Sequence, residues 1–313
     1  MGTGAPGSLR AMPSARSSVL FILGAGVLFG TAGTAQALGP AGASPMGVGI
    51  LRIEIGAVAL LIAMPFLGTS PRRLLPLLRT RAMIVTAVAA ATYQLCFFAG
   101  VSTAGVALGT LVAVGSGPVF AGLLGWGFLG HRPTRGWLVA TAACVTGLVL
   151  LAAPDLGGGS SLGLLLALGA GLCSASFNVA AKVQLNRGVS ALEVPAGSFA
   201  LGGVLLLPIL LTQPLGWLAD PRGIAVAVYL GVATMAVANV LHTLGIRGLT
   251  PGPVTTLMLA DPVVATVLGV VVLGETLAPV SMVGVLLVLA GLLLQGALVA
   301  RSGSDEPEPV PVI

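Results

Sequence analysis

The chain has 313 residues, of which 56% are hydrophobic and only 7% are charged. Soluble domains are about one quarter charged, and a water-soluble protein of this length would lack the polar residues needed to cover its surface. The net charge of +5 is not accompanied by a basic patch interleaved with aromatic residues, so we expect no nucleic-acid partner. The composition predicts an all-α integral membrane protein in contact with the lipid bilayer.

Ten apolar stretches are long enough to cross a bilayer, which takes about 20 residues per helix. Short separators rich in Gly and Pro divide them, and no separator is long enough for a soluble domain. The predicted spans are Val19–Leu38, Met46–Leu67, Ala82–Ser102, Val106–Leu129, Gly136–Ala153, Leu162–Ala181, Val194–Leu211, Gly223–Ile246, Val254–Leu273 and Pro279–Ala300. The ends, residues 1–16 and 301–313, are predicted to be disordered.

The basic residues predict the orientation of the spans. If the N-terminus is cytoplasmic, all but two of the 14 Lys and Arg residues fall on the cytoplasmic side. The exceptions are Arg222, in an outer loop, and Arg52, inside a span. Cytoplasmic loops of membrane proteins carry an excess of Lys and Arg, so we expect a multi-pass protein of the plasma membrane with both termini in the cytoplasm. The near absence of Lys suggests a GC-rich bacterial genome.

One alternative concerns the first span. Arg16, an apolar run and the segment TAQAL have the features of a cleaved secretory signal. Against this, the run continues for about 20 residues, and its LGAG at Leu23–Gly26 recurs as LGAG at Leu168–Gly171. A cleaved signal has no reason to match a later span, so we expect a retained helix.

This match belongs to an internal repeat. An offset of 144 residues aligns GPVFAGLLGWGFLG, from Gly117, with DPVVATVLGVVVLG, from Asp261, and it holds again at Gly147 and Gly291. Residues 17–153 and 162–300 are therefore predicted to be two copies of one five-span unit. Because five is odd, the second copy must enter the membrane from the opposite side. Inverted repeats of this kind are typical of transporters, with the solute site at the midplane between the halves.

Several segments resemble one family. The segment LADPVVATVLGVVVLGETLAPVSMVGVLLVLAGLLL is similar to the last two helices of the EamA domain of the drug/metabolite transporter superfamily, and GSGPVFAGLLGWGFLGHRPT resembles the matching part of a first EamA domain. LRIEIGAVALLIAMPF and ATYQLCFFAGVSTAGVALGTL resemble the second and third helices. The resemblance covers residues 17–300. It implies a secondary carrier of a small metabolite, such as an amino acid, and favours export.

The sequence departs from the family pattern at two positions. His131 stands where the first domain usually has Glu, so only Glu275 keeps that role. Asp261 precedes Pro262 where relatives often have a neutral residue. A mechanism that needs paired glutamates is therefore not implied.

Asp261 and Pro262 lie close to the middle of the ninth predicted span. An acid at this depth costs roughly 2.5–3.5 kcal/mol on insertion scales, and Pro removes a backbone donor and frees carbonyl groups. Such a break is tolerated only where it faces protein or water. We expect the pair to line a cavity, where Asp261 would bind an amine or a proton; the alternative is a hydrogen bond to a neighbouring helix.

Arg52 and Glu54 lie in the outer half of the second span. At this spacing they cannot face each other on a helix, so each needs another partner. Arg52 could bind a carboxylate of the solute, or could be bonded to helix-end carbonyls instead. Glu54 is, with Asp261, a candidate for proton coupling.

For the remaining candidates, a structural role is a strong alternative to a functional one. Tyr93 and Gln94 in the third span, and Asn178 in the sixth, could line a pocket, whereas interhelical hydrogen bonds are the alternative. His242 could relay protons, but a lone His in an apolar helix is more often a satisfied interior group. Pro118 is expected at a helix break, and His131 and Glu275 at helix ends. Lys182 is expected to extend to the membrane surface.

No phosphate-binding loop, metal-ligand cluster or nucleophile motif occurs, so we expect no cofactor, no metal and no enzymatic activity. The sequence therefore predicts a ten-span secondary transporter that exports a small metabolite by alternating access. The alternatives are an uptake carrier for a sugar or another metabolite, and a non-transporting scaffold. The apolar tenth span offers a surface for a homodimer.

Overall fold

The structure, a computed structural model, describes residues 13–156 and 160–302. The ends that were predicted to be disordered lie mostly outside this range. Within it, every regular element is helical, and ten helical spans are long and apolar enough to cross a membrane. The all-α fold with ten spans is therefore confirmed.

The first half of the chain supplies five spans. They are α1 (Ala15–Ala37), α2 (Pro45–Phe66), α4 (Arg81–Ala104), α5 (Val106–Leu129) and α6 (Arg135–Ala152). The short helix α3 (Leu74–Leu77) lies in the loop between α2 and α4.

The second half repeats this order with two interrupted spans. Three of its spans are single helices: α7 (Ser161–Asn186), α8 (Glu193–Leu210) and α13 (Pro279–Ser302). The eighth span consists of α9 (Pro221–Tyr229), a π-helical segment (Leu230–Val237) and α10 (Ala238–Gly248). The ninth span consists of α11 (Pro251–Leu257) and α12 (Ala260–Leu273), with a break between them.

Hydroxyl side chains determine where several spans begin. At each of these starts a Ser or Thr side chain accepts a hydrogen bond from the backbone N–H three residues later, which otherwise has no partner. These caps are Ser14, Ser44, Thr80, Thr134 and Ser160.

The ends of α5 and α12 show the repeat in atomic detail. Each helix stops at a glycine in the left-handed conformation, Gly130 and Gly274, both with φ of 71°. The next residue then donates its N–H back to a glycine carbonyl 3.1 Å away: His131 to Gly125, and Glu275 to Gly269. The two motifs are 144 residues apart and use the same bonding pattern.

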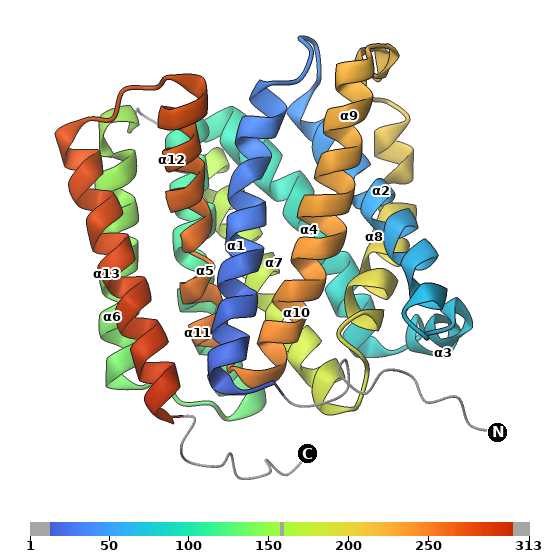
Figure 1. The fold of residues 1–313 in the computed structure, drawn as a ribbon, viewed down its shortest axis with the longest axis horizontal. Coiled ribbons are helices and arrows are strands. Elements are labelled where there is room, and N and C mark those ends of the chain that lie inside the picture. Colours follow the sequence, from blue (N-terminus) through green and yellow to red (C-terminus); the bar gives the residue numbers. More distant parts are fainter. Residues whose placement is uncertain (1–12, 157–159, 303–313) are drawn as a thin grey trace.

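The packing of α6 against α13 shows that the two halves are related by a twofold axis. A Cβ added to Gly147 of α6 would lie 2.7 Å from Gly284 O and Val288 N, and one added to Gly291 of α13 would meet the equivalent residues of α6, Ala140 and Cys144. Such reciprocal contacts are what a twofold axis imposes on an interface. The two helices run in opposite directions, so the axis lies across the bundle (Figure 1).

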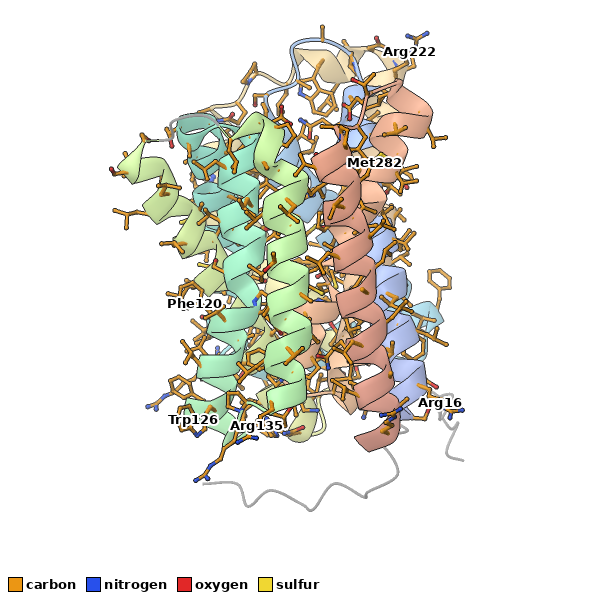
Figure 2. All side chains as sticks on the ribbon, turned by 90° about the vertical axis from the view of Figure 1, so that its left-hand side faces the viewer. Arg16, Phe120, Trp126, Arg135, Arg222 and Met282 are labelled. Carbon is orange, nitrogen blue, oxygen red and sulfur yellow. The ribbon has the colours of Figure 1, made fainter. Side chains whose placement is uncertain are left out.

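The two ends of the bundle differ in charge. Arg16, at the start of α1, and Arg135, at the start of α6, lie at one end, whereas Arg222 lies at the other (Figure 2). We call these the Arg135 end and the Arg222 end. Because α13 also finishes at the Arg135 end, the first and last spans have their outer termini on one face (Figure 1).

Proline has different effects in the two halves. The ninth span is interrupted at Met258 and Leu259, just before Asp261 and Pro262. By contrast, α5 is continuous through Pro118, so the expected break there is wrong. Pro118 removes one backbone donor without ending α5, as prolines inside transmembrane helices often do. In α11, Thr255 and Thr256 additionally bond backbone carbonyls, which competes with regular helix.

The glycines at the α6–α13 crossing provide the first test. Gly147→Ala and Gly291→Ala should each destabilise the protein by about 1–3 kcal/mol, because the added methyl group overpacks a backbone contact. Thermal unfolding in detergent measures this loss. The control is Gly127→Ala, where a Cβ meets nothing within 4 Å. Equal effects at all three positions would contradict the close crossing.

Candidate functional site

A cavity of about 400 Å³ lies in the centre of the bundle, between the two halves. Its wall contains residues of α1, α2, α4 and α5 from the first half and of α7, α8, α10, α11 and α12 from the second, together with Met235 of the π-helical segment. The volume lies within the range of small-molecule sites, about 300–1,000 Å³. Seven of the sequence candidates line it: Arg52, Tyr93, Gln94, Pro118, Asn178, His242 and Asp261.

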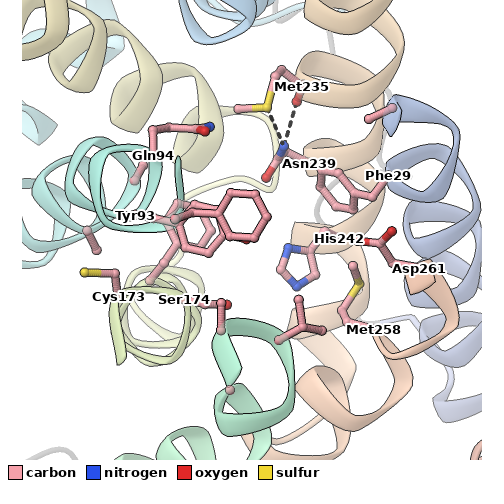
Figure 3. Close-up of a pocket in the computed structure, with 18 of the residues that line it drawn as sticks. Phe29, Tyr93, Gln94, Cys173, Ser174, Met235, Asn239, His242, Met258 and Asp261 are labelled. Carbon is pink, nitrogen blue, oxygen red and sulfur yellow. Dashed lines mark hydrogen bonds between the residues drawn. The ribbon is translucent and has the colours of Figure 1, made fainter. Parts of the chain in front are cut away.

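Asp261 lies in the first turn of α12, directly after the break in the ninth span. This position is favourable for a carboxylate, because the N-terminus of a helix carries partial positive charge. Figure 3 shows the Asp261 carboxylate on the same side of the cavity as His242 and Phe29. No side-chain hydrogen bond or ion pair of Asp261 occurs among the described residues, so its oxygens are available to a solute.

Arg52 reaches the cavity from α2 and is positioned by α4. One guanidinium nitrogen, Nη2, donates to Gln94 Oε1 at 3.3 Å, while Nε is buried without a partner in the described part of the chain. Arg52 lies within Coulombic range of Tyr93 and Asp261, yet no ion pair joins Arg52 to Asp261 there. The cavity therefore presents a separated cation and anion.

Two further polar side chains form the floor of the cavity toward the Arg135 end. Asn178 of α7 is 2% exposed and His242 of α10 is 7% exposed. The Asn178 amide donates to Ser174 O, but its Oδ1 has no partner in the described residues, and neither does His242 Nε2. Buried polar atoms are rarely left unbonded, so these two atoms suit a bound solute or water.

Aromatic side chains form most of the remaining wall. Tyr93 and Phe97 of α4 are stacked, with ring centroids 5.6 Å apart and planes 10° from parallel, and Phe98 packs edge-on against Phe97. Figure 3 shows Tyr93 on the opposite side of the cavity from His242 and Asp261. Five of the nine phenylalanines in the chain line this one cavity: Phe29, Phe97, Phe98, Phe177 and Phe199.

Four candidates lie outside the cavity wall. Glu54 faces α8 at Gly203, and Pro262 follows Asp261 on α12 without lining the cavity. Glu275 folds back over Gly269 at the end of α12. His131 lies just after the end of α5, where burial and the nearby charge of Lys182 lower its pKa.

Lys182 does not extend to the membrane surface, as was expected from sequence. It is 8% exposed, and its Nζ donates to Ile246 O at 3.0 Å and Arg247 O at 2.8 Å. The ammonium group binds the carbonyls at the end of α10 instead of extending to the membrane surface. The sequence alone could not show that this helix end lies within reach of Lys182.

Sequence reasoning also missed part of the site. The spacing of Tyr93 and Phe97, and of Gln94 and Phe98, is i to i+4, which places each pair on one face of α4 and could have indicated an aromatic wall. The π-helical segment, which contributes Met235, had no recognisable signal. Among the described residues, no group of three His, Cys, Asp or Glu side chains is placed to hold a metal ion.

Comparison with protein families agrees with this architecture. The model of the EamA-like transporter family matches residues 16–153 and 161–296, one match for each half. The chain belongs to the EamA-like transporter family. It is thus a multi-pass membrane transporter, and the resemblance inferred from its motifs is confirmed.

Three curated relatives cover most of this EamA-like transporter. It is 35% identical over 292 residues to the uncharacterized transporter YwfM of Bacillus subtilis, covering 92% of the chain and 96% of that protein. It is 30% identical over 252 residues to a probable terminal-alkyne amino-acid exporter of Streptantibioticus cattleyicolor, covering 79% and 82%. It is 29% identical over 310 residues to the threonine/homoserine exporter RhtA of Escherichia coli, covering 95% and 93%.

A solved crystal structure shares the fold. It superposes with a TM-score of 0.77 at 20% identity, covering 91% of this chain and 98% of the other. At this identity the likeness concerns the fold alone.

Solvent access to the cavity is testable with a cysteine reporter. Ser174→Cys, with Cys96 and Cys173 replaced by alanine, should react with a membrane-impermeant maleimide, because Ser174 lines the cavity. Native Cys144, which is 0% exposed at the α6–α13 crossing, is an internal control and should stay unmodified. Peptide mass spectrometry assigns the labelled site. A reporter that no aqueous reagent reaches from either face would contradict a wet cavity and favour the scaffold alternative.

Proposed function

We propose that this transporter exports an amino acid from a bacterial cell by alternating access, with both termini on the cytoplasmic side of the plasma membrane. The observation that carries the proposal is that Arg52 and Asp261 line the same cavity without forming an ion pair with each other among the described residues. An α-amino acid bears a carboxylate and an ammonium group on the same carbon atom, and this pair offers one complementary charge for each.

Each charge has a defined role in this proposal. Arg52 would donate to the solute carboxylate through the guanidinium nitrogens that Gln94 leaves free, since planar guanidinium groups suit carboxylates. Asp261 would accept hydrogen bonds from the ammonium group, and the free Oδ1 of Asn178 could complete its shell. Two of the named relatives are amino-acid exporters, which supports the same solute class.

The rest of the wall favours an apolar side chain on that amino acid. The aromatic residues, led by the Tyr93–Phe97 stack, provide apolar faces with favourable ring contacts. Threonine and homoserine carry hydroxyl groups, for which this aromatic side of the cavity supplies few partners. We therefore propose that the transporter prefers neutral amino acids with large apolar side chains.

Proton coupling, if the carrier is driven by a proton gradient, would use Asp261. It is the only acidic side chain among the described residues that line the cavity, whereas Glu54 lies against α8. A carboxylate that alternately holds a proton and an ammonium group couples the two movements in opposite directions. The homodimer stays a prediction, since α13 presents apolar residues that would suit lipid equally well.

The charge pair is tested by transport in proteoliposomes loaded with radiolabelled amino acids. Arg52→Gln and Asp261→Asn should each weaken the apparent affinity roughly 10- to 100-fold, because each removes hydrogen bonds to a charged partner. The matched control is Glu54→Gln, an acid on the same helix as Arg52 that does not line the cavity, and it should transport normally. Loss of activity in the control alone, or in none of the three, would contradict the assignment.

Proton coupling is tested in the same vesicles. An inward proton gradient should accelerate export by the wild type, and Asp261→Asn should carry out exchange of solute for solute that no longer responds to the gradient. A gradient response retained in Asp261→Asn would show that the coupling group lies elsewhere.

The aromatic wall is tested by selectivity. Phe97→Ala should raise KM for phenylalanine by roughly tenfold or more, since a large apolar contact is lost, while KM for alanine changes little. Phe128→Ala provides the control, because Phe128 is 76% exposed on the lipid-facing surface. An equal loss for both solutes would contradict a side-chain subsite at Phe97.

A further inference from the structure

Lys182 connects two helices beneath the cavity. Its Nζ donates to two carbonyl oxygens, of Ile246 and Arg247, in the last turn of α10. The carbonyls at the C-terminal end of a helix lack intrahelical donors and carry partial negative charge, so an ammonium group is stabilised there. The contact thus ties α7 to α10 by an interaction that is absent as soon as the two helices separate.

This contact lies directly between the cavity floor and the Arg135 end. Asn178 precedes Lys182 by four residues on α7, and His242 precedes Ile246 by four residues on α10. Residues four apart are one helical turn apart. The floor formed by Asn178 and His242 therefore lies one turn above the Lys182 contact, and this contact closes the space between α7 and α10 on the Arg135 side of the cavity.

The equivalent position in the first half is open. The offset between α1 and α7 is 145 residues, which pairs Lys182 with Ala37, and the offset of 144 pairs Ile246 and Arg247 with Ser102 and Thr103 of α4. Lys182, Ile246 and Arg247 are all buried, whereas Ala37, Ser102 and Thr103 are all exposed. The ends of α7 and α10 are therefore in contact at the Arg135 end, whereas the equivalent ends of α1 and α4 are apart at the Arg222 end.

The lining of the cavity agrees with this asymmetry. Gly33 and Gln36, near the end of α1, border both the central cavity and a second depression formed by loop residues 39–43 at the Arg222 end. The cavity thus extends toward the Arg222 end and stops at the Asn178–His242 floor.

We propose that Lys182 is the gate residue of the Arg135 end: its bonds to the α10 carbonyls hold the transporter open toward the Arg222 end, and breaking them precedes opening to the other side. The first half has no lysine at the equivalent position, so the state seen here is favoured over its mirror state. This inference rests on transport by alternating access and on no assumption about the solute.

The Ser174→Cys reporter measures the gate without any solute. In membrane vesicles of both orientations, the rate of maleimide labelling is determined separately from each face, with Cys96 and Cys173 replaced by alanine. Lys182→Met should raise labelling from the Arg135 end about tenfold or more and lower it from the Arg222 end. Two hydrogen bonds from a charged donor are then lost from only one of the two states. The matched control is Arg187→Met, an exposed basic residue just after α7, which should label like the wild type.

A second variant keeps the test independent of how well Lys182→Met folds. Ala37→Lys adds a lysine at the exposed equivalent position, within reach of the last-turn carbonyls of α4 when α1 and α4 approach. It should lower labelling from the Arg222 end and raise it from the Arg135 end, whereas Ala37→Gln should have little effect.

The two variants shift labelling in the same direction if the proposal holds. Unchanged labelling from both faces in Lys182→Met, together with unchanged labelling in Ala37→Lys, would show that the Lys182 contact is only structural. A shift of equal size in Arg187→Met would also overturn the proposal. Failure of amino-acid transport with a normal labelling response would instead contradict the proposed solute and leave the gate intact.

Discussion

A polar or charged side chain in the hydrocarbon core must face protein or water, because lipid offers it no hydrogen-bond partner. Every feature of the central cavity follows from this constraint. Arg52, Asp261, Asn178 and His242 lie within spans, and all four line the central cavity. Glu54 faces protein at another place: its carboxylate packs against α8 at Gly203, and its Oε1 is buried without a hydrogen-bond partner among the described residues.

The odd number of spans per repeat adds the second constraint. Two copies of a five-span unit can share a bilayer only when one is inverted, and the twofold axis then runs through the α6–α13 crossing. In the proposed alternating-access cycle, the two halves, which have related sequences, exchange their arrangements. The side chains that break the symmetry, above all Lys182 against Ala37 and Asp261 against Gly117, would then decide which arrangement is favoured and where charge is placed.

Much of this could be predicted from the sequence, for identifiable reasons. Span number, repeat boundaries and a break close to Asp261–Pro262 depend on local hydropathy and on proline chemistry, which are properties of short segments, although the break lies at Met258 and Leu259, just before this pair. The direction of Glu54 and the uninterrupted path of α5 through Pro118 depend on neighbours that only the folded chain provides. Lys182 shows the limit most clearly: a lysine near a membrane surface usually extends to water, and only the nearby end of α10 gives it a better partner.

The reciprocal opening of the two ends is the central claim, and paired spin-label distances measure it most directly. Labels at Ala37 and Ser102 report the Arg222 end, and labels at Arg187 and Thr250, in a separate sample, report the Arg135 end. On addition of phenylalanine in lipid, the first distance distribution should shift to shorter values while the second shifts to longer ones. Distances that change in the same direction, at one end only, or not at all would contradict the account.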